Sequence, residues 1–521
     1  MEAAAVTAEA ASASIQGEEW LQPLQVFLSV FFFSFAASFL ALSLLLKLLR
    51  WRPWCGCPVC YTYTTGAWAA EFPNLCDWYA HLLRQSPTRT VCIHVLGCVV
   101  TANPANVEHM LRTRFDNYPK GRAFSAILGD LLGRGIFNVD GECWRFQRKV
   151  ASLELGSTHV RSFALRVFSS EVRERLLPLL ASASASGGVR LDLQDVFRRF
   201  SFDTICRVSF GVDPGCLELS LPVSEFSAAF DKASRLSAGR ATVSSPIVWK
   251  LKRLLNVGSE RELRRCVRLI DDLAGEVIRQ KRKSLGQESQ DLLSRFMASI
   301  PDEKYLRDIV VSFLLAGRDT VASTLSCFFL LLSDHPEVEA AILEEAARVM
   351  GDAAVPGGSS IPTYDQLREM HYVHAALFES MRLYPAVQFD SKFAVDDDVL
   401  PDGTFVGRGT RVTYHPYAMG RMEEAWGSDC LQFRPRRWLT EEGTFLPESP
   451  YKYPVFQGGT RVCLGKEMAV LEMKCVVVAV VRAFRLRSLL PDGAPPKFAP
   501  SLTATLSGGL PVRVARRRDR E

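Results

Sequence analysis

The 521-residue sequence lacks a large excess of either charge and contains no Asn-x-Ser/Thr sequon. Lys and Arg number 62 against 57 Asp and Glu, and the net charge of +5 is too slight to indicate a nucleic-acid partner. The 14 cysteines are scattered along the chain, unlike the dense framework of a small secreted domain. Scattered cysteines without sequons predict reduced thiols on the cytosolic side of a membrane.

Charge is also missing from one long stretch near the N-terminus, residues 20–46. As a helix this stretch is about 40 Å long, enough to cross a hydrocarbon core of about 30 Å. A cleaved signal peptide would require basic residues before its apolar stretch. Here no Lys or Arg precedes the stretch, and basic residues begin only at Lys47. The positive-inside rule then places the N-terminus in the lumen of the endoplasmic reticulum. We expect a luminal segment at 1–19, a signal-anchor helix at 20–46, a hinge at 47–70 and a cytosolic catalytic domain at 71–521.

Three cysteines follow the expected anchor at short spacing, Cys55, Cys57 and Cys60. Cysteine is a common zinc ligand, but a zinc site needs four ligands and none of the right type follows nearby in the sequence. Ordinary thiols or lipidated cysteines are therefore favoured here over a metal site.

Residues 456–465, FQGGTRVCLG, place one cysteine among several glycines. A thiolate that binds haem iron must lie close beneath a flat macrocycle. Gly458, Gly459 and Gly465 would permit that approach and the turns with positive φ that it requires. Free backbone N–H groups can then point at the sulfur and tune the metal. The loop predicts that Cys463 is a haem ligand, and the alternative is a buried structural cysteine.

The same loop resembles the cysteine-ligand signature of the cytochrome P450 family, the haem-thiolate monooxygenases, at Phe456, Gly459, Arg461, Cys463 and Gly465. Arg461 offers a cation for a haem propionate, and Phe456 offers an apolar plate for the ring. The resemblance implies a mainly α fold with small β-sheets, haem b ligated by the thiolate, and O₂ as a substrate. NADPH would supply electrons through a separate cytochrome P450 reductase, since the sequence shows no flavin or nucleotide-binding domain.

Most of the chain is typical of helices, whereas the β-branched residues 91–101 predict a short hairpin. Within the apolar stretch 306–333, Gly317, Asp319 and Thr320 are weak helix formers. A functional site would account for them: small residues leave room for O₂, Thr320 hydrogen-bonds to it, and Asp319 relays protons from solvent. The alternative is a kinked, buried helix whose threonine bonds to its own backbone.

Further motifs agree with the resemblance and come in the family's order. Trp144 and Arg148 are four residues apart and share a helical face, where the resemblance implies contact with the haem propionates. Glu379 and Arg382 are i, i+3 neighbours that can pair. Together with Arg437 they are implied to form a buried structural triad.

Residues 116–141 are mostly apolar but contain Lys120 and Arg122, with Phe124 beside them. In the resembled family this stretch covers the distal pocket and touches substrate. We expect Lys120 and Arg122 to hold a substrate carboxylate, and the alternative is a solvated basic turn.

The stretches NYPKGR, WRFQRK, FLLAGRDT, QFDSKFA and YAMGRM are similar to plant family 94, which contains fatty-acid ω-hydroxylases. They are most similar to its C subfamily, which oxidises jasmonoyl-isoleucine at its terminal carbon. The resemblance implies 12-hydroxylation and further oxidation to the 12-carboxy form by a monomer that contacts membrane lipid. Free fatty acids are the alternative substrates. An O₂-independent isomerase and a non-catalytic haem-binding membrane protein are more distant alternatives.

Overall fold

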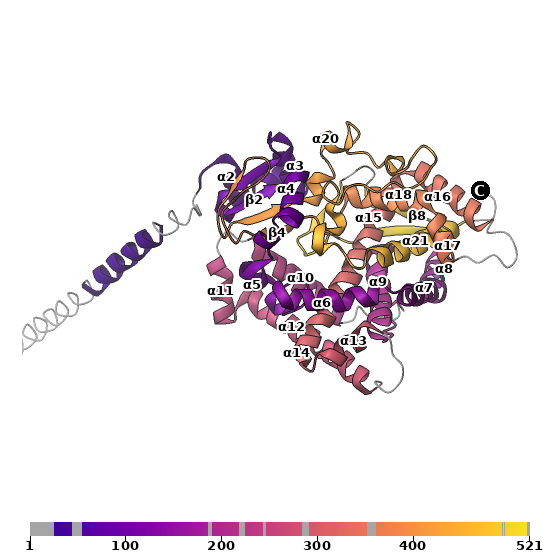
Figure 1. The fold of residues 1–521 in the computed structure, drawn as a ribbon, viewed down its shortest axis with the longest axis horizontal. Coiled ribbons are helices and arrows are strands. Elements are labelled where there is room, and N and C mark those ends of the chain that lie inside the picture. Colours follow the sequence, from indigo (N-terminus) through magenta and orange to yellow (C-terminus); the bar gives the residue numbers. More distant parts are fainter. Residues whose placement is uncertain are drawn as a thin grey trace, which may run out of the picture.

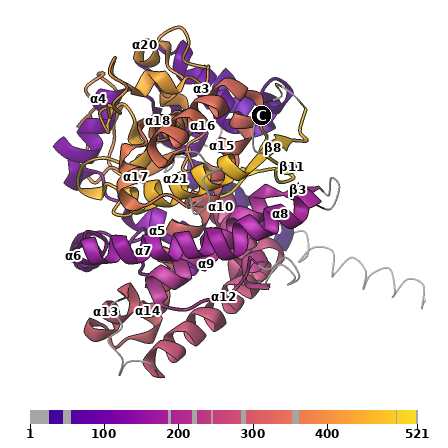
Figure 2. The same ribbon diagram turned by 90° about the vertical axis from the view of Figure 1, so that its right-hand side faces the viewer.

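The computed structural model describes residues 26–43, 55–185, 190–217, 225–242, 246–283, 291–351, 361–491, 493 and 495–517 (Figures 1 and 2). The expected luminal segment 1–19 and the first part of the expected hinge, 47–54, lie outside these residues. The described part is mainly helical with small β-sheets, as the sequence predicted.

An apolar helix, Val26–Ser43, leads away from the body of the protein (Figure 1). None of the 18 residues of this helix is buried, and large side chains such as Phe27, Phe31 and Phe33 are more than 60% exposed. A helix that is apolar on every face and covered by none of the described residues is typical of a membrane span. Among the described residues, only the helical segment Glu303–Asp334 is also long and apolar enough to cross a membrane. About two-thirds of its most apolar 18 residues are buried in the core.

The largest sheet has four strands in the order β1-β2-β7-β4. Its antiparallel hairpin confirms the one predicted from the β-branched residues 91–101. β2 runs parallel to β7, with Cys98 opposite Arg411, so the sheet pairs strands that are about 300 residues apart in the sequence. The strands are β1 (Thr90–Ile93), β2 (Cys98–Thr101), β4 (Asp390–Phe393) and β7 (Arg411–Tyr414).

Three smaller sheets complete the strand structure. One has the order β3-β11-β8, and the others are the antiparallel pairs β5-β6 and β9-β10. Their strands are β3 (Leu191–Asp192), β5 (Asp398–Val399), β6 (Phe405–Val406), β8 (Phe484–Ser488), β9 (Phe498–Ala499), β10 (Thr505–Leu506) and β11 (Pro511–Arg516).

The α-helices fill most of the chain between the strands. Those before the continuous helical segment Glu303–Asp334, called the central helix below, are α2 (Pro58–Thr65), α3 (Leu75–Gln85), α4 (Pro104–Glu108), α5 (Gly121–Leu132), α6 (Gly141–Leu155), α7 (Thr158–Glu171), α8 (Leu177–Ala185), α9 (Leu193–Phe210), α10 (Glu225–Thr242), α11 (Pro246–Leu255), α12 (Gly258–Lys283) and α13 (Leu292–Ser299). The others are α14 (Glu303–Leu314), α15 (Thr320–Asp334), α16 (Pro336–Met350), α17 (Tyr364–Glu369), α18 (His371–Leu383), α19 (Pro416–Met419), α20 (Glu423–Trp426) and α21 (Lys466–Ala483).

Short 3₁₀ and π turns link or interrupt these helices. They are η1 (Ala67–Ala70), η2 (His94–Leu96), η3 (His109–Thr113), η4 (Phe115–Asn117), η5 (Val172–Leu176), η6 (Leu315–Asp319), η7 (Pro435–Trp438), η8 (Pro454–Phe456) and η9 (Gly459–Arg461). The turns η3, η5 and η6 are π-helical.

Two apolar helices form the centre of the core. α15 buries residues on every face, including Val321, Leu325 and Phe328, and α21 buries an unbroken valine-rich run at 475–481. Helices apolar all round belong in the interior, where both join one hydrophobic cluster with α9 and α18. The turn η6 precedes α15 and the loop 456–465 precedes α21, so the core fixes the two segments that carry the predicted site.

Candidate active site

An internal cavity of about 430 Å³ lies between the central helix and the loop that precedes α21. Its wall is mostly apolar and draws on segments far apart in the sequence. The predicted site residues that line it are Lys120, Phe124, Trp144, Arg148, Thr320, Phe456, Arg461 and Cys463.

The backbone of the cysteine loop is shaped by its neighbours. Gly459 has φ +60°, and a Cβ there would lie 2.0 Å from the carbonyl oxygen of Leu111 in η3, so only glycine fits. The expectation of positive φ is wrong for Gly458 and Gly465, whose φ values are −141° and −86°. Gln457 takes the other left-handed position, with φ 64°.

The Cys463 side chain is exposed where it faces the cavity, and protein surrounds it on its other sides. Its N–H donates to the Phe456 carbonyl at 2.8 Å, which closes the loop behind the sulfur. Burial raises the pKa of its thiol, while the Gly465 backbone and the Arg148 charge act to lower that pKa. Since burial prevails, a cationic partner for the sulfur, such as a metal ion, would favour the thiolate.

Arg461 is held against the same wall. Its guanidinium lies 4.6 Å from the Trp144 ring centroid, and Nη2 donates to Asp140 Oδ1 at 2.6 Å and to the Val139 carbonyl at 3.2 Å. Its Nε is buried without a hydrogen-bond partner among the described residues. Burial lowers the pKa of both Arg461 and Arg148, so an anion in the cavity would stabilise both cations.

The carboxylate clamp expected at Lys120 and Arg122 does not form. The Lys120 ammonium lines the cavity but forms a buried ion pair with Asp390, while Arg122 is exposed and absent from the cavity wall. The sequence could not show this pairing, since the two partners are 270 residues apart. Phe124 lines the cavity, and its ring centroid lies 4.2 Å from Nζ of Lys120.

Sequence reasoning missed Lys392, a second buried lysine on this wall. Its Nζ forms an ion pair with Asp390 Oδ2 at 3.3 Å, a carboxylate that it shares with Lys120, but makes no hydrogen bond within the described part of the chain. Burial lowers the pKa of Lys392 to about 7, against the opposing effect of the Asp390 charge. A buried donor without an acceptor is costly, and an anion in the cavity would remove that cost.

These residues fit a haem. Cys463 supplies a sulfur directed at the cavity, and Phe456 with Trp144 supplies apolar surface for a flat ring. Nε of Arg461 and Nζ of Lys392 make no hydrogen bond among the described residues, and the two carboxylate-bearing side chains of a macrocycle would provide acceptors for them. Haem bound here would supply the iron at which O₂ is activated.

Opposite the loop, the central helix widens into the π turn η6 between α14 and α15. Asp319 is buried and pairs with Arg318 at 2.7 Å, and burial raises the pKa of its carboxyl. Arg318 also pairs with Asp231 at 2.7 Å, so an ion-pair chain links Asp319 to a partly exposed carboxylate. Thr320 lines the cavity, and its hydroxyl donates to the Ala316 carbonyl at 2.5 Å. π turns within α-helices are frequent at functional sites.

The structure gives Gly317 a second reason besides room for O₂, which stays a prediction. A Cβ there would lie 2.4 Å from Cδ1 of Ile205 in α9, so the glycine lets α9 pack against the central helix. The residue does line the cavity, but close packing of two helices is sufficient to require it.

Away from the cavity, the structure brings Glu379, Arg382 and Arg437 together. Both Glu379 and Arg382 are fully buried, with Nε and Nη2 of Arg382 donating to Glu379 at 2.7 and 2.8 Å. Arg437 Nε donates to the same carboxylate at 3.3 Å. Trp438, the next residue, also donates its indole N–H to Glu379, at 2.9 Å. This network ties α18 to η7, and none of its four residues lines the cavity.

Comparisons with known proteins agree with this geometry. The family model described as Cytochrome P450 matches residues 81–510. The chain is 58% identical to Cytochrome P450 94C1 of Arabidopsis thaliana over 94% of this chain and 98% of the relative. It is 49% identical to Cytochrome P450 94B3 of the same plant and 44% identical to Cytochrome P450 94A2 of Vicia sativa, over 85% and 86% of this chain and 88% of each relative. A match of this extent means that the chain belongs to the cytochrome P450 family, within its family 94, and is a haem-thiolate monooxygenase.

Proposed function

We propose that the protein oxidises the terminal carbon of jasmonoyl-isoleucine to the 12-hydroxy form and onward to the 12-carboxy form. In each hydroxylation one atom of O₂ enters a C–H bond and the other leaves as water, with two electrons from NADPH and two protons. The resemblance of the chain to the C subfamily of family 94 supports this substrate. One structural observation carries the proposal, a cation on the cavity wall that has no acid partner.

That cation is Arg411, the first residue of β7. Its Nη1 donates to the Ala241 carbonyl at 3.0 Å, while its Nε is buried and, in the part of the chain that the structure describes, has no partner. No ion pair involves it among those same residues. Lys120, by contrast, already has its counter-charge in Asp390. Arg411 therefore replaces Lys120 and Arg122 as our candidate for the substrate carboxylate.

The position of Arg411 in its strand suits a substrate oxidised at the far end from its acid. Tyr414, at the other end of β7, hydrogen-bonds to Gln457 of the cysteine loop. Tyr414 is three residue steps along the strand from Arg411, a distance of about 10 Å. A carboxylate at Arg411 would leave the apolar remainder of the molecule to extend along the cavity toward Cys463. Positioning of this kind overrides the greater reactivity of internal C–H bonds.

Protons for the reaction would come through this chain's own side chains. We propose that Thr320 accepts and donates a proton at the cavity wall and that Asp319 supplies it from solvent. Exchange of Asp319 between Arg318 and solvent would connect the buried carboxyl to the surface through Asp231, which is about one-quarter exposed. General acids of this kind contribute typically 10²–10⁴-fold to a rate.

The membrane setting is part of the proposal. Val26–Ser43 would anchor a monomer in the endoplasmic reticulum membrane, with residues 71–521 in the cytosol and residues 47–70 as a hinge. Support comes from the fully exposed apolar surface of that helix and from the basic residues that follow it. As a cytochrome P450, the enzyme takes its electrons from a reductase, which the cytosolic side would make accessible.

The test uses microsomes that contain the protein and a plant cytochrome P450 reductase. Jasmonoyl-isoleucine and free fatty acids are supplied separately with NADPH, and the products are identified by mass spectrometry. We expect 12-hydroxy- and 12-carboxy-jasmonoyl-isoleucine at low substrate concentration. Efficient ω-hydroxylation of fatty acids with no oxidation of the conjugate would contradict the proposed substrate.

The proposed clamp is tested with Arg411→Met, using the exposed Arg408→Met as a matched control. A charge-assisted contact contributes about 1.5–3 kcal/mol, so its loss should raise the KM for the acid about ten- to a hundredfold. The KM for the methyl ester should change little in either variant. An equal effect on acid and ester would mean that Arg411 only holds β7 against α10.

A further inference from the structure

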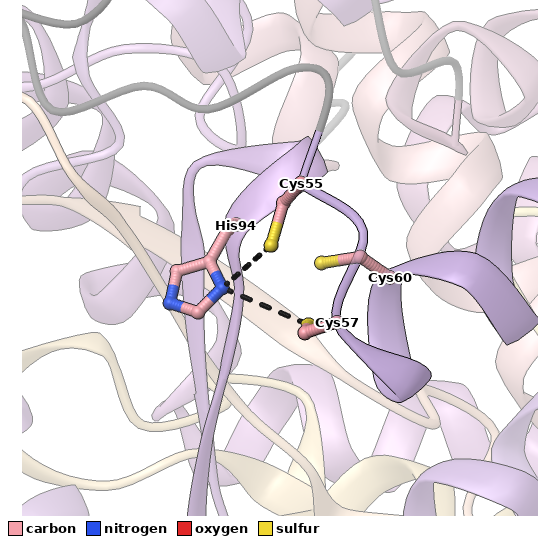
Figure 3. Close-up of side chains that lie close together, drawn as sticks. All are labelled: Cys55, Cys57, Cys60 and His94. Atoms are coloured by element: carbon pink, nitrogen blue, oxygen red, sulfur yellow. Dashed lines mark hydrogen bonds between the residues drawn. The ribbon is translucent and has the colours of Figure 1, made fainter.

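Outside the active site, three cysteines and a histidine converge where the described catalytic domain begins. The sulfur atoms of Cys55, Cys57 and Cys60 and a ring nitrogen of His94 all lie within 4.8 Å of one another (Figure 3). Among the described residues, no other group of His, Cys, Asp or Glu side chains is gathered in this way. The sequence hid the fourth member, because His94 lies on the turn between β1 and β2, well beyond the three cysteines.

We propose that this cluster binds a structural Zn²⁺ ion through three thiolates and Nδ1 of His94. Tetrahedral zinc has Zn–S bonds of about 2.3 Å and Zn–N bonds of about 2.0–2.1 Å, so its sulfur and nitrogen ligands lie about 3.6 Å apart. In the structure the sulfurs of Cys55 and Cys57 lie 3.4 and 3.9 Å from His94 Nδ1. The dashed lines in Figure 3 mark these two contacts, and the sulfur of Cys60 points toward the same centre.

The local structure holds the four ligands in place. Cys57 is the N-cap of α2 and Cys60 lies in its first turn, where the positive end of the helix dipole favours thiolates. Pro58, at the first position of the helix, fixes the turn between them. His94 opens η2, and that turn is closed by the hydrogen bond from Gly97 N–H to the His94 carbonyl at 3.0 Å.

Zinc accounts for the cluster better than the alternatives considered for the cysteines. A disulfide would use two sulfurs and leave the third thiol and the histidine without a role, and all three cysteines are free. A reducing cytosol also disfavours it. Lipidation needs an accessible thiol, whereas Cys60 is buried. Four ligand atoms of the two types that zinc prefers are used together only by a metal.

Binding balances chemically without a redox partner. The ion displaces the three thiol protons, the imidazole binds in its neutral form, and the site carries a net charge of −1. The metal would cross-link the segment at the start of α2, which carries the three cysteines, to the turn η2 of the large sheet, which carries His94. Its role would be structural, since Cys463 and the cavity are built from other elements.

The test measures zinc and iron by mass spectrometry in the full-length, haem-loaded protein, purified through a tag that contains neither His nor Cys. We expect about one zinc per haem in the wild type and in the control Cys92→Ala, whose thiol is exposed on β1 two residues from His94. The variants His94→Ala and Cys55→Ser/Cys57→Ser should lose that zinc.

X-ray absorption at the zinc edge of the wild-type protein needs no variant and therefore does not depend on whether the variants fold. We expect three sulfur neighbours at about 2.3 Å and one nitrogen at about 2.0 Å. Wild-type protein produced with ample zinc that carries less than about one-tenth of an ion per haem would overturn the proposal. So would a shell of oxygen and nitrogen alone, or a disulfide or thioester on these cysteines found by peptide mass spectrometry.

Discussion

Gly317→Ala should destabilise the protein through Ile205, and a compensating change in that side chain should restore part of the loss. A Cβ at Gly317 would lie 2.4 Å from Cδ1, 2.5 Å from Cγ1 and 3.0 Å from Cβ of Ile205. Favourable carbon–carbon contacts begin at about 3.5 Å, so α9 or the central helix must move by about 1 Å. Overpacking of this kind typically costs about 1–3 kcal/mol.

Ile205→Ala removes the two closest atoms and leaves only the contact at 3.0 Å. Alone, it should cost at most about 2 kcal/mol, the lower end of the range for such changes in a core, because Ile205 is half-buried and already lines the cavity. In the double variant each change relieves the other, and we expect a coupling free energy of about 0.5–3 kcal/mol. The assay is urea denaturation of the four proteins at one haem concentration, followed by circular dichroism and by the carbon monoxide difference spectrum.

Two outcomes would refute this reasoning. If the losses of stability in the single variants add in the double variant, the contact with Ile205 does not explain Gly317. If Gly317→Ala leaves stability unchanged and instead releases peroxide at the expense of product, the glycine provides room for O₂, as the sequence suggested.

Three further predictions concern the cavity. Thr320→Ala should still bind haem and substrate but consume more NADPH per product, with peroxide released, because the proton donor on the wall is lost; an unchanged ratio of product to NADPH would exclude this role. Lys392→Met should lose haem several-fold faster when challenged with apomyoglobin, since the buried Nζ that lacks an acceptor is our candidate for a haem carboxylate; equal loss rates would remove it from the site. Burial raises the pKa of Glu472 to about 8, against the opposing effect of its hydrogen bond with Thr204, whereas an unfolded Glu titrates near about 4.3. The folded protein therefore holds a proton that the unfolded chain releases, and its stability should fall as pH rises from about 4.3 to about 8. Glu472→Gln should flatten that part of the profile, and a slope equal to that of the wild type would contradict the shift.

The predictions that succeeded rest on local patterns. The hairpin at 91–101 follows from a β-branched run with a turn, and the apolar helices follow from composition over many residues. The spacing of Glu379 and Arg382 within one helix was also sufficient to bring their side chains together. The cysteine loop was recognisable because its glycines and Cys463 are contiguous.

What the sequence could not show depends on partners that only the fold brings together. Asp390 neutralises Lys120 from a distant strand, and a lysine that is solvated in one fold is paired in another. The reason for Gly317 lies on a different helix, at Ile205. The role of Lys392 could not be predicted because it depends on burial of the side chain. No periodicity of the sequence marks one buried lysine on an edge strand.

The parallel pairing of β2 with β7 has a consequence for synthesis of the protein on the ribosome. All four residues of β2 are buried in the finished sheet, and its partner strand is encoded about 300 residues later. At about 5–20 residues per second, β2 waits roughly 15–60 s for β7 to emerge. During that time its apolar edge is open for pairing with other chains. If the apolar helix inserts first, this nascent edge waits at the membrane surface until β7 emerges.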